Sequence, residues 1–263
     1  MNPQAPPKTP IPGIRNIVAV GSGKGGVGKT TVSVNLALAL QRLGRRVGLL
    51  DADVYGPNVP LMMNINRPPR SSDERIEPVE NYGVKLMSMG FLNPGDKPLI
   101  WRGPMLHSAI QQFLRNVDWG QLDYLIIDLP PGTGDVALSL AQTTPVTGAI
   151  VVTTPSEVSL EDARKAVNMF YQVRIPMLGL VENMSGDVFG RGGGRRTAEK
   201  MNLAFLGELA LDSEIRIGGD TGKPVATRDA SDPHAAPFLE LARVVEQRCA
   251  ESQTEGPSIT IED

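Results

Sequence analysis

The feature that most constrains this 263-residue chain is a glycine-rich segment at residues 23–30, Gly-Lys-Gly-Gly-Val-Gly-Lys-Thr. Residues 16–21 form an apolar, β-branched run before it, and residues 28–43 carry a helical pattern after it. The segment therefore lies at a strand-to-helix turn, where backbone N–H groups and the N-terminus of the helix can surround a polyphosphate. We predict a phosphate-binding loop.

The loop contains one more cation than such a loop needs. Lys29 is placed to reach the terminal phosphates, and the hydroxyl of Thr30 is placed to bind Mg²⁺. Lys24 is the additional lysine. The alternative, a glycine-rich turn without nucleotide, is disfavoured by the flanking strand and helix. The loop residues predicted to bind nucleotide are Gly23, Lys24, Gly25, Gly26, Val27, Gly28, Lys29, Thr30 and Thr31.

Apolar runs alternate with helical patterns along the chain. This alternation predicts an α/β fold with a doubly wound, mostly parallel sheet that has helices on both faces. Residues 62–83 show no periodicity and are expected to form a long surface excursion. We expect one domain at residues 14–250, between a flexible proline-rich arm at 1–13 and a flexible tail at 251–263. The expected strands are 16–21, 46–50, 84–87, 124–128, 148–153 and 178–182, and the expected helices are 28–43, 104–116, 135–143, 157–172 and 235–249.

Composition argues against several classes of function. A net charge of −3 and a pI near 5.6 give no bulk attraction for nucleic acid or anionic lipid. No apolar run approaches the roughly 20 residues of a spanning helix, and the first residues lack an apolar signal core, so we expect a cytoplasmic protein. The single cysteine, Cys249, excludes an intrachain disulfide and an intrachain site with several cysteine ligands.

Two aspartates, Asp51 and Asp53, follow the second expected strand. Ligands of open α/β sheets lie beyond the carboxyl ends of the strands, so both carboxylates are expected to face the loop. One can orient an attacking water while the other holds the hydration shell of Mg²⁺. Alternatively, Asp51 is a capping residue and Asp53 is a solvated turn residue.

A third carboxylate, Asp128, ends the apolar run at 124–128. It has the layout of a Walker B aspartate, which accepts hydrogen bonds from water bound to Mg²⁺. The following Pro-Pro-Gly-Thr-Gly-Asp at 130–135 cannot continue a strand, because its prolines lack N–H donors. We predict a switch loop near the γ-phosphate; the alternative is a strand that simply ends at an aspartate.

From about residue 14 to residue 248 the chain resembles the Mrp/ApbC iron–sulfur carrier ATPases, of the deviant Walker A class that contains MinD and ParA. The resemblance is carried by the loop with its additional lysine and by the segments Asp-Ala-Asp-Val-Tyr-Gly-Pro-Asn-Val-Pro at 51–60, Met-Ser-Met-Gly-Phe at 87–91, Trp-Arg-Gly-Pro-Met at 101–105, Asp-Trp-Gly at 118–120, Asp-Leu-Pro-Pro-Gly-Thr-Gly-Asp at 128–135 and Glu-Asn-Met-Ser at 182–185.

The resemblance implies a homodimeric, slow ATPase with ATP and Mg²⁺ at the subunit interface. Lys24 of one subunit would reach the phosphates bound by the other, so the expected catalytic residues are Lys24, Lys29 and Asp53, with Asp53 acting on the lytic water. Asp51 and Asp128 would organise Mg²⁺ through bound water.

The resemblance also implies that Asn183 hydrogen-bonds the adenine. This residue follows the apolar run at 177–181, and its carboxamide offers both a donor and an acceptor, which suits adenine.

The chain departs from the family immediately after the Asn-Met-Ser segment at 183–185. In the carriers, a Cys-x-x-Cys motif follows within a few residues, and two subunits together hold a [4Fe–4S] cluster with four thiolates. Here the sequence continues Gly-Asp-Val-Phe-Gly-Arg-Gly-Gly-Gly at 186–194, without cysteine. The family implies a cluster, whereas these residues oppose one, and no iron–sulfur ligand is predicted. Cys249 is expected to be an ordinary helix residue.

Two further features have competing interpretations. The basic cluster Arg191, Arg195 and Arg196 could bind nucleic acid or an acidic partner, but a solvated loop leading into a helix is favoured. The helix at 235–249 could lie on a membrane, yet its polar face lacks a basic excess, so packing against the domain is favoured. The isolated histidines His107 and His234 make no metal site.

Three functions are consistent with the sequence. The first is an Mrp-type ATPase in iron–sulfur protein maturation, acting on a client or scaffold protein without a cluster of its own. The second is a switch similar to ParA and MinD, whose ATP-bound dimer recruits a protein or DNA partner. The third, a nucleotide-binding protein that has lost turnover, is disfavoured by Lys24 and Asp53.

Overall fold

The computed structural model describes residues 8–54, 56–72, 75–92, 103–132 and 134–254. Tyr55, Trp101, Arg102 and Thr133, which belong to the family-like segments, lie outside the described residues. The strands are β1 (Ile14–Gly21), β2 (Val47–Asp51), β3 (Arg70–Ser72), β4 (Arg75–Glu77), β5 (Val79–Asn81), β6 (Val84–Ser88), β7 (Leu122–Asp128), β8 (Gly148–Thr153), β9 (Met177–Ser185) and β10 (Phe205–Ala210). The helices are α1 (Lys29–Arg42), α2 (Val59–Met62), η1 (Met89–Leu92), α3 (Gly103–Arg115), α4 (Asp135–Thr143), α5 (Glu157–Gln172), α6 (Gly193–Lys200), α7 (Ser213–Asp220), η2 (Val225–Thr227) and α8 (Ala236–Thr254).

Eight of these strands form one sheet in the order β10-β9-β8-β1-β7-β2-β6-β5. All neighbouring pairs in it are parallel except β5 with β6. The carboxyl ends of the central strands are in register, since Asp51 of β2 pairs with Asp128 of β7 on one side and Ser88 of β6 on the other. The predicted doubly wound, mostly parallel sheet is confirmed.

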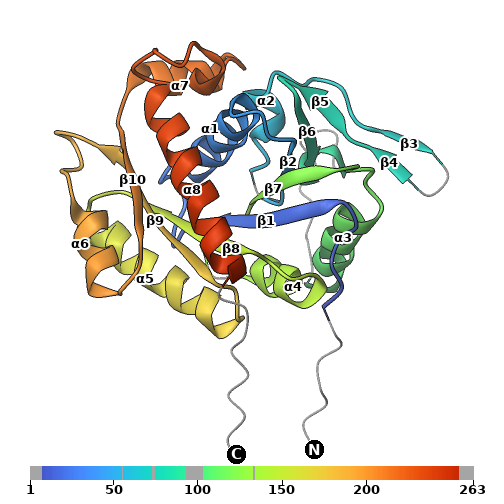
Figure 1. Cartoon of the computed structure of the whole chain (residues 1–263), viewed down its shortest axis with the longest axis horizontal. Helices are drawn as coiled ribbons and strands as arrows, with labels where there is room; N and C mark the ends of the chain where they lie inside the picture. Colours follow the sequence, from blue (N-terminus) through green and yellow to red (C-terminus); the bar gives the residue numbers. More distant parts are fainter. Residues whose placement is uncertain (1–7, 55, 73–74, 93–102, 133, 255–263) are drawn as a thin grey trace, which may run out of the picture.

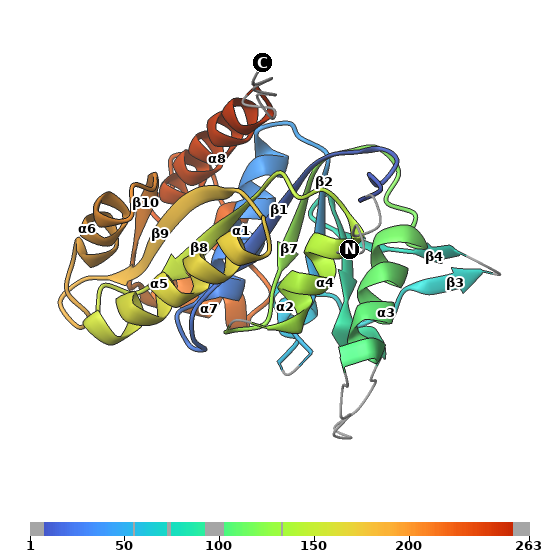
Figure 2. The same cartoon turned by 90° about the horizontal axis from the view of Figure 1, so that it is seen from below.

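Helices cover both faces of the sheet. Figure 1 shows α1, α7 and α8 on one side and α3, α4 and α5 on the other, and Figure 2 shows the same layers after a 90° rotation. Alternate residues of one strand enter different cores: Val18 and Val20 of β1 pack with α1 and α8, whereas Ile17 and Ala19 pack with α3, α4 and α5. A strand buried on both faces needs a continuous apolar run, which is the pattern of residues 16–21.

The C-terminal helix α8 packs against the domain, as predicted. Phe238, Leu241, Ala242 and Val245 are at most 2 % exposed and join the core that contains α1. No helix among the described residues is long and apolar enough to cross a membrane.

Three segments differ from expectation. Residues 62–83 contain ordered strands: β5 extends the main sheet, and β3 and β4 form an antiparallel pair whose Ile76 is buried. In the proposed arm, Ile11 is 6 % exposed and packs in the core. Helix α8 extends past the expected boundary to Thr254. The strands in 62–83 have only three residues each, which is too short to show a period.

Candidate nucleotide site

The predicted phosphate-binding loop connects β1 to α1 and uses backbone conformations that only glycine adopts easily. Gly26 and Gly28 have φ angles of 80° and 79°. A Cβ atom at Gly28 would overlap the side-chain nitrogen of Asn183, and one at Gly23 would overlap the backbone carbonyl of Asp162 in α5. The glycines thus permit both the turn and the close packing of β9 and α5 against the loop.

Asp128 brings the chemical groups of the loop together. The Nζ atom of Lys29 lies 2.8 Å from Oδ1 of Asp128, and the hydroxyl of Thr30 donates a 2.8 Å hydrogen bond to Oδ2. The hydroxyl of Ser33 lies 2.6 Å from Oδ1. Lys29 is 6 % exposed and Asp128 is 0 % exposed, so this ion pair is held within the protein. A cation, a hydroxyl and a carboxylate therefore converge at the N-terminus of α1.

Asp51 lies beside this group at the end of β2. Its carboxylate accepts hydrogen bonds from the Ser88 hydroxyl at 2.9 Å and from the backbone N–H of Asp53 at 3.1 Å. Complete burial and the neighbouring charge of Asp128 raise the pKa of Asp51 to about 8. Asp51 and Asp128 are both 0 % exposed and occupy paired positions of β2 and β7, so two carboxylates lie close together where water is largely excluded.

Asp53 follows Asp51 and is 8 % exposed. Its carboxylate accepts a 3.3 Å hydrogen bond from the backbone N–H of Gly56, which holds it in the turn after β2. The alternative that Asp53 is a solvated turn residue is therefore disfavoured, because its side chain is buried.

Asn183 lies against the opposite side of the loop, near the end of β9. Its Nδ2 atom donates a 2.9 Å hydrogen bond to the carbonyl of Val27. The same residue lines a cavity of about 470 Å³ together with Thr30, Thr31, Asn58 and Asp212. The second hydrogen of Nδ2 and the Oδ1 atom make no hydrogen bond to a described residue, so both can face a ligand in this cavity.

Lys24 has a different environment from Lys29. Its side chain is half-buried, and within the described part of the chain its ammonium group has no ion pair. The backbone carbonyl of Lys24 accepts a 2.9 Å hydrogen bond from Ser22, which fixes the loop at this position. The structure therefore fixes the Lys24 backbone, and the ammonium group of Lys24 forms no ion pair with any residue that the structure describes.

Three residues of the site were not predicted from the sequence. Ser33 follows Lys29 by four positions and so lies on the same face of α1, a spacing that the sequence displays. Ser88 reaches Asp51 only because β6 lies beside β2, which the chain order does not reveal. Asp212 lines the cavity and caps α7, where it accepts a 2.7 Å hydrogen bond from the backbone N–H of Glu214.

Two of the three arginines in the basic cluster Arg191, Arg195 and Arg196 contact other parts of the protein. Arg191 forms a 3.0 Å ion pair with Glu208, and the guanidinium of Arg195 lies 4.4 Å from the ring centre of Phe205. Both contacts link α6 and its preceding loop to β10, which supports the structural interpretation over a nucleic-acid site.

Cys249 is a core residue of α8. It is 1 % exposed, and burial together with the charge of Glu246 raises the pKa of its thiol to about 12. The prediction that it is an ordinary helix residue is confirmed. The Nδ1 atom of His234 lies 3.1 Å from the carboxylate of Asp212.

A glycine-rich loop between a central strand and a helix, with a buried lysine and an aspartate at the end of the adjacent strand, defines a P-loop NTPase. The chain belongs to the NUBPL iron-transfer P-loop NTPase family, whose model matches residues 13–246.

Named relatives agree with this assignment. The chain is 51 % identical over 247 residues to the iron–sulfur cluster carrier protein of Deinococcus radiodurans, covering 89 % of this chain and 70 % of the relative. It is 46 % identical over 260 residues to the mouse iron–sulfur cluster transfer protein NUBPL, covering 94 % and 82 %. The family resemblance stated from the motifs is thereby confirmed.

Solved structures show the same architecture. The nucleotide-binding protein of Archaeoglobus fulgidus in complex with ADP superposes with a TM-score of 0.72 at 37 % identity, covering 82 % of this chain and 90 % of that chain. The Pyrococcus horikoshii MinD protein complexed with Mg-ADP has a TM-score of 0.72 at 24 % identity, covering 91 % and 98 %. The latter similarity concerns the fold alone.

Proposed function

We propose that this chain binds ATP and Mg²⁺, hydrolyses ATP slowly as a homodimer, and uses this cycle in iron–sulfur cluster transfer. The observation that carries the proposal is the convergence of Lys29 and Thr30 on the carboxylate of Asp128 at the N-terminus of α1. The proposed role in iron–sulfur cluster transfer rests on the names of the relatives, which are cluster carrier and cluster transfer proteins.

The donor set suits Mg²⁺. A hydroxyl from Thr30 and carboxylates from Asp51 and Asp128 are the hard oxygen ligands that this ion prefers, directly or through water. When bound, Mg²⁺ would neutralise charge on the phosphates. Lys29 would move from Asp128 to a phosphate oxygen, because both partners are anionic oxygens within reach of one buried ammonium group.

The absence of an ion pair between Lys24 and the described residues supports a role for its charge across a dimer interface. A half-buried ammonium without an ion pair among the described residues can interact with the phosphates of a second copy at little cost. Asp53 is proposed to hold the attacking water, because its carboxylate is buried beside Asp51 and fixed by the N–H of Gly56.

The residues of this chain do not fit a [4Fe–4S] cluster. Its single cysteine is buried in α8, and a cluster of this type takes four thiolates. Where the carriers have their cysteine pair, Gly186 and Gly190 exchange backbone hydrogen bonds of 2.9 and 2.8 Å and close a short loop. We therefore assign this chain the nucleotide-dependent part of cluster transfer, acting on a client or scaffold that provides the thiolates.

The same loop favours a second candidate, a nucleotide switch that recruits a protein partner. Val188 at its tip is 74 % exposed and Phe189 is 39 % exposed. Exposed apolar side chains at such a tip are suited to protein contact.

The proposed ATPase cycle can be tested with three alanine variants. Lys29→Ala should lose nucleotide binding, whereas Lys24→Ala should retain nucleotide but lose ATP-dependent dimerisation. Asp53→Ala should form the ATP dimer and release phosphate at least about 100-fold more slowly. Phosphate release and light scattering during gel filtration, each with and without ATP, measure these effects.

Lys200→Ala is the matched control, because Lys200 is exposed at the end of α6, away from the loop. Normal dimers of Lys24→Ala would refute the cross-subunit role, and unchanged turnover of Asp53→Ala would refute its role in hydrolysis. Reconstitution with iron and sulfide should give no stable absorbance near about 400 nm, since four thiolates are required. A robust signal that Cys249→Ser abolishes would overturn the assignment without a cluster.

A further inference from the structure

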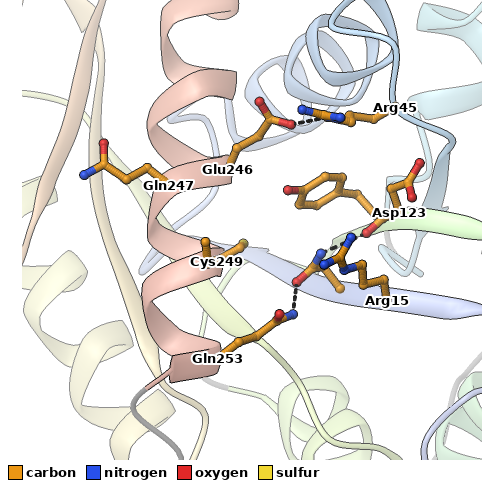
Figure 3. Close-up of a pocket in the computed structure, with 10 residues that line it drawn as sticks. Arg15, Arg45, Asp123, Glu246, Gln247, Cys249 and Gln253 are labelled. Carbon is orange, nitrogen blue, oxygen red and sulfur yellow. Dashed lines mark hydrogen bonds and ion pairs between the residues drawn. The ribbon is translucent and has the colours of Figure 1, made fainter.

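A second cavity lies at the amino ends of the central strands, where β1 and β7 begin. It has a volume of about 380 Å³ and is bounded by these strands, by Arg45 in the turn after α1, and by α8. Figure 3 shows Glu246, Cys249 and Gln253 projecting from α8 toward Arg45, Asp123 and Arg15. The nucleotide site uses the carboxyl ends of the strands, so this cavity is a separate feature of the fold.

Both carboxylates at the cavity already have cationic partners. Asp123 accepts hydrogen bonds from the backbone N–H and the guanidinium of Arg46, at 2.9 to 3.2 Å. Glu246 accepts a 2.5 Å hydrogen bond from Nε of Arg45. The acidic groups that line the cavity are therefore neutralised without any contribution from Arg15.

Three sets of donors remain available. The guanidinium of Arg15 forms no ion pair or hydrogen bond with the described residues, and the two terminal nitrogens of Arg45 form none either. Tyr124 is 7 % exposed, and its hydroxyl has no hydrogen-bond partner in the part of the chain that the structure describes. Burial, followed by the neighbouring Cys249 and Glu246, raises the pKa of Tyr124 to about 12, so this hydroxyl keeps its proton at neutral pH.

We propose that this cavity binds a small oxyanion, either phosphate or a small carboxylate, through Arg15, Arg45 and Tyr124. Guanidinium groups bind oxyanions through parallel, charge-assisted hydrogen bonds, and the Tyr124 hydroxyl, which lines the cavity, can donate a further hydrogen bond to the same ligand. The amides of Asn16 and Gln253 bond to each other at 2.7 Å, which fixes the wall of the cavity. The volume suits a small ion better than a nucleotide.

Calorimetry can test the site with inorganic phosphate and with succinate as separate probes, at constant ionic strength. The experiment is done with the full chain in the presence of Mg-ADP, which occupies the phosphate-binding loop, and again with the Lys29→Ala variant. Both conditions prevent the probe anions from binding at the loop. We expect one anion per chain in both forms. Arg15→Gln should weaken binding about tenfold, and Tyr124→Phe should weaken it about threefold because it removes only one neutral donor. Binding of phosphate, of succinate or of both above the chloride control supports the site, and failure of both probes to bind would overturn the proposal.

Arg67→Gln is the matched control, because Arg67 is exposed and has no ion pair among the described residues. A second measurement uses the single cysteine of the chain, Cys249, which lines the cavity. A bound anion should slow its reaction with a thiol reagent in the native chain and in Arg67→Gln, but not in Arg15→Gln. Equal anion affinity in Arg15→Gln and Arg67→Gln would also refute the site. If Arg15→Gln does not fold, the anion affinity of Tyr124→Phe provides the test.

Discussion

The side-chain nitrogen of Asn183 donates a 2.9 Å hydrogen bond to the carbonyl of Val27, which joins the end of β9 to the phosphate-binding loop. Because Asn183 also lines the adjoining cavity, a ligand there and the loop contact the same carboxamide. The position that would contact the base therefore also determines the shape of the loop that would contact the phosphates.

This relationship predicts a large effect of Gly28→Ala. The new methyl group would overlap the Asn183 side chain and would occupy a φ of 79°. We expect a loss of about 2–4 kcal/mol in the free energy of unfolding and at least tenfold weaker nucleotide binding. Gly44→Ala is the control, because Gly44 has a φ of 83° with no atom near its Cβ position. It should lose only about 1 kcal/mol in urea denaturation; equal losses would show that the overlap is unimportant.

The sequence predicts the sheet and the loop well because both depend on local patterns. The apolar runs that form β1 and β7 are long, and their strands are buried on both faces. Strand β10 and helix α7 were not predicted. Gly207 and Glu208 interrupt the apolar pattern of β10, and α7 contains Gly218 and Gly219, which have low helix propensity.

The site was predictable only where its residues follow a recognisable motif. Asp51, Asp53 and Asp128 each end or follow a strand, so their common location follows from the topology of an open sheet. The contact of Ser88 with Asp51 depends on which strand lies beside β2. The hydrogen bond from Asn183 to Val27 likewise requires the three-dimensional position of β9 beside the loop.

Ser33→Ala is expected to weaken the dependence of nucleotide binding on Mg²⁺ without abolishing binding. The Ser33 hydroxyl lies 2.6 Å from Oδ1 of Asp128 and helps to orient this carboxylate. Its loss should raise the Mg²⁺ concentration for half-maximal binding about three- to tenfold, in line with one hydrogen bond to a charged group. Fluorescent ATP titrations at several Mg²⁺ concentrations measure the effect. Ser139→Ala, in α4, should leave the Mg²⁺ requirement unchanged, and the same shift in both variants would contradict the role of Ser33.

Glu182→Ala should destabilise the region that follows β9. The completely buried carboxylate of Glu182 accepts hydrogen bonds from the backbone N–H groups of Gly192 at 2.7 Å and Gly194 at 2.5 Å, where α6 begins. Removing it leaves the buried N–H of Gly194 and the partly buried N–H of Gly192 without their partner, so we expect a loss of about 2–4 kcal/mol in urea denaturation. Hydrogen exchange should accelerate at both amides. Glu199→Ala, at an exposed position of α6, should change stability by less than about 0.5 kcal/mol.

The ion pair of Asp123 and Arg46 predicts a defined dependence of stability on pH. Hydrogen bonds from the Arg46 side chain and backbone lower the pKa of Asp123 from 3.8 to about 2. A carboxyl whose folded-state pKa is lowered stabilises the protein above its unfolded value of 3.8, and this contribution is lost as the pH falls toward 2. Asp123 is 23 % exposed and Arg46 is 60 % exposed, so solvent screening reduces the contribution at pH 7 to about 1 kcal/mol.

Asp123→Asn should therefore lower the free energy of unfolding by about 1 kcal/mol at pH 7, and the difference from the native chain should shrink steadily below about pH 4. Urea denaturation of both chains between about pH 3 and pH 7 measures this difference directly. Asp118→Asn is the control, because the Asp118 carboxylate is 63 % exposed and lies 3.8 Å from Arg75, too far for a close hydrogen bond. If the difference in the free energy of unfolding stays constant over this pH range, Asp123 stabilises the fold through its packing and not through its charge.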